Sequence, residues 1–293
     1  MSKPTITEDY RDNNNLREKF YRFTQALFPG VNFFDWYNQG YWSDKYVPVS
    51  VILDDKVVSN VSISKMKICI DGDYLDGIQI GTVGTLPEYR NRGLSRFLMD
   101  YVLNKYNNLC DIYFLFANET VLDFYSKFGF NRYHEVIFKS SSEIPISKYC
   151  ARKLNILNNS DLSIIKKCIK GRRVLTRLFG AAEYDFITHW HLLNVFLDNL
   201  YYLEDEGVIF ICNEKNDQLY IWDVIYTKPF NLSRAVSRII RNKEVRSVLY
   251  YFPPDQLSYI YDEVIPDKES YLFVKGEFKI KNKKFKFPIT AQT

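Results

Sequence analysis

The sequence predicts a mixed α+β fold in which a mostly antiparallel central sheet is flanked by helices. Three observations in the first half of the chain predict it. Residues 16–28 place apolar side chains at helical spacing. Residues 47–86 then change to short apolar runs separated by turns, which is typical of antiparallel strands. Residues 94–109 return to helical spacing. This order indicates one layer of strands covered by helices.

Short turn signals divide the sheet-forming segment into strands. Asp54-Asp55 and the segment GDYLDG at 72–77 are polar and rich in turn formers, so residues 47–86 are expected to form three strands. Gly129 is well placed to end a short helix, because glycine readily takes the left-handed conformation found after a helix. The elements expected after residue 109 are a buried strand at 111–118, that short helix at 121–128 and a strand at 130–138.

The second half repeats the order of the first in a shorter form. Residues 140–147 (SSSEIPIS) are the best candidate for a linker, so the sequence predicts domains at 1–140 and 148–293. The second domain is expected to be a diverged copy of the first. The elements expected in it are a strand at KLNIL, a helix capped by Asp161, a long helix at 186–203, a hairpin at 208–227 that turns at Asn216-Asp217, a helix at 233–241 and strands at 245–252 and 270–276.

Composition limits the class of protein. The 293 residues are 46% hydrophobic and 25% charged, which is typical of a globular chain of about two domains. The net charge of +4 is too small to argue for nucleic acid. Five cysteines without a CxxC pair predict free thiols in a reducing compartment. The polar N-terminus and the lack of a membrane-length apolar run complete the expectation of a cytoplasmic protein without a membrane partner. Homo-oligomer formation is left open.

Two further stretches resemble binding sites at first sight. His189-Trp190-His191 suggests a metal pair, but alternate residues of a helix face different directions and no Cys, Asp or Glu stands at ligand spacing. Residues 234–246 are basic, but apolar residues at helical spacing interrupt them, which favours a solvated helix face. We therefore expect neither a metal site nor a nucleic-acid site.

One segment carries a chemical signal. In residues 81–96 a strand ends, a loop rich in Arg and Gly follows, and a helix begins. The free amides and positive dipole end of a helix N-terminus attract anions, and Gly93 allows the backbone to approach a phosphate closely. Arg90, Arg92 and Arg96 add positive charge. Taken alone, the pattern fits a pyrophosphate cradle and a basic surface loop about equally well.

The same segment resembles the pyrophosphate-binding motif of the GNAT superfamily of acetyltransferases, usually Q/R-x-x-G-x-G/A. Arg90, Gly93 and Ser95 hold the three marked positions, and Ser95 departs from the usual Gly or Ala. Asn118-Glu119 and the segment 124–130 resemble the second signature of the superfamily, F-Y-x-x-x-G-F. The overall plan is most similar to the two-domain acetyltransferases related to the enhanced-intracellular-survival family, without their sterol-carrier-like domain.

The resemblance implies an N-acetyltransferase that uses acetyl-CoA as co-substrate and needs no metal. The backbone of Val83, Gly84 and Thr85 would bind the pantetheine and polarise the thioester carbonyl. The remaining residues that the resemblance assigns to the cofactor are Arg90, Asn91, Arg92, Gly93, Leu94, Ser95, Arg96, Asn118 and Glu119.

The resemblance also suggests the catalytic residues. Tyr125 is expected to protonate the departing thiolate, and the alternative is a tyrosine that only packs beside Phe124. A base must take the proton of the attacking amine. In the related family the terminal carboxylate does so, and Thr293 matches it if the tail folds back; otherwise the tail is a mobile basic segment. Glu88 is expected to face solvent.

Three functions remain open at this stage. The first is acetylation of a small-molecule primary amine, with aromatics at 33–46 and the second domain shaping the acceptor pocket. The aromatics expected near the predicted long helix are Tyr184, Phe186, Trp190, Tyr201 and Tyr202. The second function is acetylation of a lysine or a protein N-terminus, and the third is a non-catalytic coenzyme A-binding module. The second half lacks a glycine loop and carries Pro229 before its helix, so it is not expected to bind acetyl-CoA.

Overall fold

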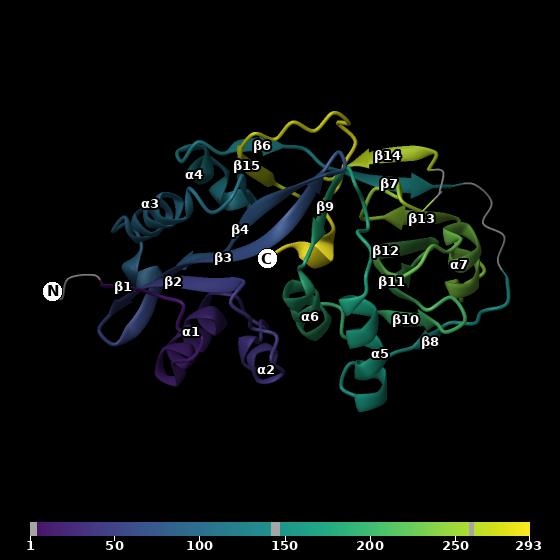
Figure 1. Cartoon of the computed structure of the whole chain (residues 1–293), viewed down its shortest axis with the longest axis horizontal. Coiled ribbons are helices and arrows are strands. Elements are labelled where there is room, and N and C mark those ends of the chain that lie inside the picture. The colour runs from purple at the N-terminus through teal and green to yellow at the C-terminus, as the bar shows by residue number, and fades with distance from the viewer. Residues whose placement is uncertain (1–4, 142–146, 258–260) are drawn as a thin grey trace.

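The computed structural model describes residues 5–141, 147–257 and 261–293. Two mixed sheets lie side by side, and the C-terminus lies between them near the centre of the molecule (Figure 1). The fold class predicted from the sequence is confirmed. Most of the expected linker at 140–147 falls outside the described residues.

The first sheet has the strand order β1-β2-β3-β4-β5-β15-β6, and β9 pairs with β3. Its central meander of β2, β3 and β4 confirms the three strands expected at 47–86. Among the described strands of this sheet, β4 and β5 are the one parallel pair. The strands of this sheet are β1 (Thr5–Glu8), β2 (Tyr46–Leu53), β3 (Lys56–Ile70), β4 (Asp73–Thr85), β5 (Ile112–Phe116), β6 (Asn131–Tyr133), β9 (Phe179–Ala182) and β15 (Leu272–Gly276).

The second sheet has the strand order β14-β7-β13-β12-β11-β10-β8. The hairpin of β11 and β12 turns at Asn216, which has a left-handed φ of 56°, so the hairpin predicted at 208–227 is confirmed. The strands are β7 (Val136–Ser140), β8 (Arg152–Lys153), β10 (Leu200–Leu203), β11 (Val208–Lys215), β12 (Gln218–Ile225), β13 (Ser247–Tyr250) and β14 (Glu263–Pro266).

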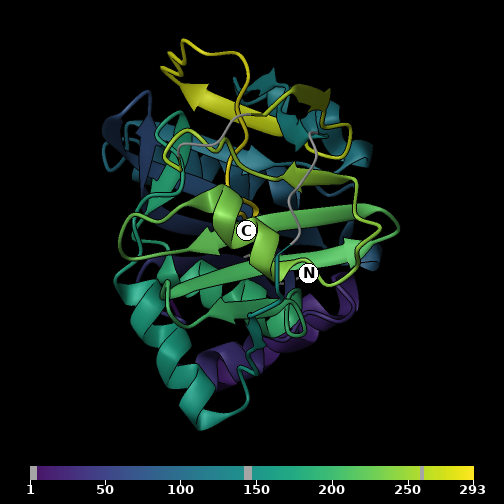
Figure 2. The ribbon, with the colours of Figure 1, turned by 90° about the vertical axis from the view of Figure 1, so that its right-hand side faces the viewer.

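Helices cover both faces of the first sheet. Along β5, Ile112 and Phe114 join a core with Phe20, whereas Tyr113 and Leu115 join a different core. The helices are α1 (Asn14–Leu27), α2 (Phe33–Asn38), α3 (Leu94–Tyr106), α4 (Leu122–Ser126), α5 (Asn159–Lys170), α6 (Asp185–Asn194) and α7 (Leu232–Ile239). Short 3₁₀ turns lie at Pro87–Tyr89, Glu119–Val121 and Ile289–Ala291. In Figure 2, α7 lies over the strands of the second sheet.

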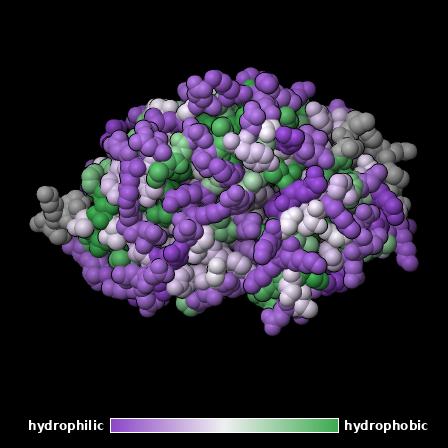
Figure 3. Space-filling view, in the orientation of Figure 1, coloured by the Kyte–Doolittle hydropathy of each residue, from purple (hydrophilic) through white to green (hydrophobic). Residues whose placement is uncertain are grey.

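The surface is mostly polar, as expected when the apolar side chains are buried in the cores. The face in Figure 3 is mostly hydrophilic, with its apolar side chains in small groups. Among the described residues, no helix combines the length and the apolar surface needed to cross a bilayer.

Four local predictions were wrong. The strand expected at KLNIL overlaps β8 only at Lys153. The long helix expected at 186–203 is instead α6 followed by strand β10, because the helix ends after Asn194 and the chain re-enters the second sheet. The strand expected at 130–138 is divided into β6 and β7, which belong to different sheets. Asn158, not Asp161, caps α5 by accepting hydrogen bonds from the amides of Ser160 and Asp161. Asp161 accepts from Arg152 instead.

The two sheets exchange strands across the expected domain boundary. β7, which precedes residue 141, pairs with β13 and β14 in the second sheet. In the other direction, β9 pairs with β3, and β15 lies between β5 and β6 in the first sheet. The first sheet therefore needs strands from the end of the chain, and the division into 1–140 and 148–293 does not follow its hydrogen bonding.

A buried group of charges fixes the segment that follows β15. Lys286 Nζ lies 2.9 Å from Glu135 Oε2 and 2.8 Å from Asp267 Oδ2, and all three side chains are nearly inaccessible to solvent. The amide of Phe287 donates to Glu135 Oε1 at 2.5 Å. Buried charges are tolerated only when they are paired and hydrogen-bonded, so these contacts hold the tail in one position.

We expect Lys286→Ala to lower the free energy of unfolding by about 3 kcal/mol, because it leaves Glu135 and Asp267 as unpaired buried charges. Urea denaturation followed by circular dichroism measures this loss. Lys283→Ala is the matched control, because Lys283 is exposed three residues away. Equal stability of the two variants would contradict this account of the tail.

Candidate functional site

The site begins where β4 and β5 separate. Their parallel ladder runs from Gly77–Ile112 to Ile80–Leu115 and then ends. β4 continues to Thr85, whereas Phe116, the last residue of β5, pairs with β15 on the other edge of β5. Residues 81–85 of β4 and residues 116–118 at the end of β5 therefore diverge and leave a V-shaped opening in the sheet, with backbone groups on both edges.

A β-bulge turns β4 at this opening. The register between β3 and β4 shifts between Asn60 and Ser62, and Thr82 has a left-handed φ of 48°. This backbone conformation is costly for a β-branched residue, and buried polar groups stabilise it. Asn60 Nδ2 donates to the carbonyl oxygen of Thr82 at 2.8 Å, and the hydroxyls of Tyr46 and Thr82 lie 3.0 Å apart. Bulges commonly redirect a strand beside a functional site.

A cavity of about 820 Å³ fills the opening. Its wall is formed by the divergent part of β4, the N-terminus of α3, the segment after β5, helix α4, the end of α1 and the tail. The residues on this wall are Leu27, Phe28, Val31, Phe33, Ile80, Gly81, Thr82, Val83, Gly84, Thr85, Tyr89, Arg90, Asn91, Gly93, Leu94, Ser95, Arg96, Phe116, Ala117, Asn118, Thr120, Val121, Phe124, Tyr125, Trp190 and Thr293.

Most of the residues assigned from the sequence lie on this wall. All of the cofactor-binding candidates from Val83 to Asn118 line it except Arg92, and both catalytic candidates line it. Arg92 instead donates to the carbonyl oxygen of Glu88 at 2.9 Å and lies over the ring of Tyr89. Glu119 is exposed and is also absent from the wall. Glu88 is exposed, as the sequence predicted.

The N-terminus of α3 is open toward the cavity. Gly93 occupies its N-cap position with a left-handed φ of 74°, and no side chain caps the helix there. The amides of the first turn are therefore available to an anion. The Ser95 hydroxyl already has a partner within the protein, because it lies 2.7 Å from the hydroxyl of Thr85. That hydrogen bond ties α3 to β4, and Arg90 Nε donates to the carbonyl oxygen of Thr85 at 3.2 Å.

Tyr125 stands on the opposite edge of the opening. It belongs to α4, is almost fully buried, and contacts the rings of Phe124, Phe130 and Phe273. Burial raises the pKa of the Tyr125 phenol to about 12. The phenol therefore keeps its proton at neutral pH and can donate it, which is what a general acid must do.

The tail folds back into the first sheet and ends in the cavity. The backbone amide of Thr293 donates to Gln79 Oε1, and its hydroxyl donates to the same atom at 2.8 Å. Gln79 Nε2 donates to the carbonyl oxygen of Ala291 at 2.8 Å. A Cβ atom at Gly81 would collide with Thr293, so the glycine leaves the room that Thr293 occupies. These contacts fix Thr293 against β4.

The two histidines of α6 each contact another part of the protein. His191 Nε2 lies 2.7 Å from the carbonyl oxygen of Gln292, and burial lowers the pKa of His191 to about 4. The neutral ring can therefore donate to that carbonyl and hold the residue beside Thr293. The ring of His189 stacks on Tyr41 at 3.8 Å. No group of three or more potential metal-ligating residues (His, Cys, Asp or Glu) occurs in the described part of the chain.

Several residues of the site were missed from the sequence. Gln79 and Asn60 support the tail and the bulge, but each occurs in a strand segment with no motif. Tyr46, which also contacts the bulge, is the last of the aromatics at 33–46. Phe28 and Val31 look like ordinary residues around the Pro29-Gly30 turn. Only the aromatics at 33–46 gave a signal, and of these Phe33 reaches the wall. Of the aromatics expected from the second half, Trp190 lies on the wall, whereas Tyr201 and Tyr202 are in β10.

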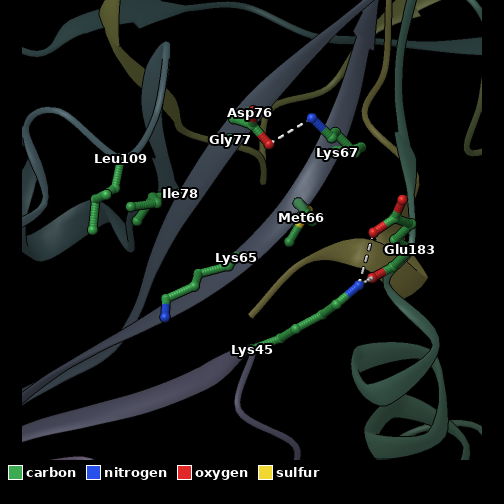
Figure 4. Close-up of a pocket in the computed structure, with 9 residues that line it drawn as sticks. All are labelled: Lys45, Lys65, Met66, Lys67, Asp76, Gly77, Ile78, Leu109 and Glu183. Carbon is green, nitrogen blue, oxygen red and sulfur yellow. Dashed lines mark hydrogen bonds and ion pairs between the residues drawn. The ribbon is translucent and has the colours of Figure 1, made fainter.

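A second, smaller cavity of about 370 Å³ lies near the other end of β3 and β4. Its lysines point along the sheet surface, and two of them are paired (Figure 4). Lys45 Nζ lies 3.0 Å from Glu183 Oε2, and Lys67 Nζ lies 2.7 Å from Asp76 Oδ1. Because these charges already neutralise each other, the larger cavity is the better candidate.

The second sheet contains a counterpart of the β4-α3-β5 unit. β12 and β13 are parallel and are connected through α7, as β4 and β5 are through α3. The N-terminus of α7 differs, however, because the Asn231 side chain caps it by accepting from the amide of Arg234 at 2.8 Å. The two units are alike in topology and unlike in the helix end that would meet an anion.

Comparison with known proteins agrees with this geometry. Residues 6–133 match the family model described as the acetyltransferase (GNAT) domain. A comparison with curated proteins found no match to the sequence. The match covers β4, the α3 loop, Tyr125 and the segment between them.

Solved structures extend the likeness to nearly the whole chain. A conserved protein of unknown function from Enterococcus faecalis V583 has a TM-score of 0.63 at 14% identity, covering 94% of this chain and 72% of that one. A GCN5-related N-acetyltransferase from Kribbella flavida has a TM-score of 0.56 at 15% identity, with 94% and 72% coverage. Eis1 from Mycobacterium abscessus has a TM-score of 0.56 at 13% identity, with 92% and 73% coverage. These likenesses show the fold of nearly the whole chain, and residues 6–133 match the acetyltransferase (GNAT) domain within it.

Proposed function

We propose that the protein is an N-acetyltransferase that transfers the acetyl group of acetyl-CoA to a primary amine of a small molecule. One observation carries the proposal. A single cavity combines an uncapped helix N-terminus, a protonated buried tyrosine and Thr293 at the separation of two parallel strands. Each of these features meets one requirement of the reaction.

The cavity wall suits the co-substrate in both charge and shape. The pyrophosphate would lie at the first turn of α3, beside Arg90 and Arg96. The pantetheine would follow residues 83–85, whose backbone is free of a partner strand on the β5 side. A Cβ atom at Gly84 would lie 2.6 Å from Leu27, so the glycine permits α1 to pack closely on β4 and form one wall of the channel.

In the proposed reaction the neutral amine attacks the thioester carbonyl carbon directly. The new C–N bond forms as the C–S bond breaks, and the oxyanion is stabilised by backbone amides at the β4 bulge. The main-chain carboxylate of Thr293 accepts the proton of the amine, and the Tyr125 hydroxyl donates a proton to the sulfur. The products are the acetylated amine and free coenzyme A.

We also propose that residues 148–293 close the acceptor side and bind no acetyl-CoA. Trp190 and Thr293, both from this half, lie on the cavity wall. The amide of Asn32, in the turn between α1 and α2, donates to Asn194 Oδ1 of α6 at 2.6 Å, so the two halves meet beside the opening. A cavity walled by both halves of the chain is better suited to a small molecule than to a peptide. The side-chain cap of α7 and Pro229 support the absence of a second cofactor site.

We expect Gly93→Glu to abolish acetyl-CoA binding in calorimetry while the fold survives. The substitution strains a left-handed position and places a negative charge where the phosphates would lie. Gly207→Glu is the matched control, because Gly207 has a similar φ of 67° and, like Gly93, open space at its Cβ position. Wild-type affinity of the Gly93 variant would overturn the assignment of the cofactor site.

We expect Tyr125→Phe to lower kcat by about 10²-fold and to leave acetyl-CoA affinity nearly unchanged. Because the pKa of Tyr125 is about 12, its protonated form persists across the assay range. The wild-type rate should therefore rise with pH as the amine loses its proton, without a fall below pH 11 caused by Tyr125. Tyr133→Phe, outside the cavity, is the control. Unchanged turnover of the Tyr125 variant would reduce Tyr125 to a packing residue.

We expect one glycine appended after Thr293 to reduce turnover at neutral pH and to spare acetyl-CoA binding, because it moves the carboxylate away from β4. The loss should shrink at high pH, where the free amine no longer needs a base. Thr293→Ser keeps the carboxylate and the hydroxyl and serves as control. A constant loss at every pH would point to a disturbed cavity instead of a missing base.

A further inference from the structure

One part of the cavity wall is apolar and comes from three separate helical elements. Leu27 is the last residue of α1, Phe28 and Val31 lie in the turn after it, Phe33 begins α2, and Trp190 belongs to α6. The rings of Phe33 and Trp190 lie 6.2 Å apart. We call these five residues the apolar wall. They bring large hydrophobic side chains to a cavity that also holds polar catalytic groups.

The apolar wall lies close to the proposed reaction centre. Leu27 and Phe28 approach Gly84 of β4, and Thr293 approaches Gly81 of the same strand. Three residues along a strand span about 10 Å. Leu27, Val31, Phe33 and Trp190 belong to or pack against the core that includes Ala291 of the tail, whereas Leu94 and Leu98 of α3, at the phosphate-binding end, belong to a different core. The apolar wall is therefore available to a ligand that reaches the same bend of β4 as the acetyl group.

Few charged side chains line the cavity, and those that do are positive. Its described residues include two arginines, Arg90 and Arg96, and no aspartate or glutamate. Both arginines lie at the loop and helix that would hold the phosphates. The acceptor side thus offers aromatic or aliphatic surface and, in the proposed reaction, a single anion, the main-chain carboxylate of Thr293.

We infer that the preferred acceptor is a monoamine with an apolar or aromatic body, and that polycationic amines are poor substrates. The inference rests on the proposed function and names its substrate class. The amine nitrogen would lie toward Thr293 and the body against the apolar wall. A second or third ammonium group on the acceptor would have to lose its water against apolar side chains without a carboxylate partner, which is strongly unfavourable.

The test measures kcat/KM of the full-length protein with acetyl-CoA and three groups of acceptors. The first group is the series from butylamine to hexylamine with 2-phenylethylamine. The second is spermidine and kanamycin, and the third is a lysine-containing peptide. Along the alkylamine series we expect about a threefold to fourfold rise per methylene, which is the transfer free energy of one buried methylene expressed as a ratio. 2-Phenylethylamine should exceed spermidine by at least 10²-fold.

A variant separates the apolar wall from general effects on the fold. Val31→Asp should reduce turnover of 2-phenylethylamine by at least tenfold and should raise turnover of spermidine relative to it, because it supplies a second anion. Phe34→Asp is the matched control: Phe34 is half-exposed, lies in the same segment, and is not on the cavity wall. Acetyl-CoA affinity, measured by calorimetry, should be equal in all three proteins.

The outcomes distinguish the inference from the function beneath it. Spermidine, kanamycin or the peptide used as well as 2-phenylethylamine, or a flat alkylamine series, would overturn the substrate class and leave the acetyltransferase intact. Equal acceptor preferences in the Val31 variant and its control would also overturn it. No acetylation of any acceptor, together with normal acetyl-CoA binding, would overturn the proposed function itself.

Discussion

The parting of β4 from β5 after Ile80 is the constraint on which the rest of the site depends. Parallel strands normally satisfy each other's backbone groups along their whole length, so a sheet opens only where other contacts replace those bonds. Here the amide of Ala117, after β5, donates to the carbonyl oxygen of Tyr271, and Asn60 stabilises the turned backbone of β4 at Thr82. The opening exposes backbone amides at the bend and creates the volume that a ligand needs.

The exchange of strands between the two sheets brings the tail to that opening. A segment must travel from the second sheet to the first to supply β15 and then bring Thr293 to β4. The buried contacts of Lys286 fix this path, and so does Asp223, which accepts from Thr290 and pairs with Arg172 at 2.9 Å. Each contact is costly to bury unpaired, so the tail has few alternative positions. Stability of the tail and geometry of the site are therefore coupled.

Local patterns predicted the strands and most helices, because spacing and turn residues act within a few positions. The prediction of one helix at 186–203 was wrong because this apolar run contains both a helix and a strand, and periodicity alone does not separate them. The Arg90–Ser95 loop and Tyr125 were accessible through motifs. The positions of Gln79 and Val31 were not, because their roles come from residues far away in the sequence. The pairing of β15 with β5 had no local signal for the same reason.

The two β-α-β units show how small a difference separates a ligand-binding helix end from a structural one. In α7 the Asn231 side chain occupies an amide of the first turn, whereas in α3 Gly93 has no side chain and leaves the amides open. Glycine in place of an asparagine cap costs a helix only about a few tenths of a kcal/mol, so the absence of a side-chain cap at α3 is a small cost to stability. The glycine loop and the open helix end thus belong together. The N-terminus of α7 has neither, which is consistent with a second half that shapes the cavity without holding a cofactor.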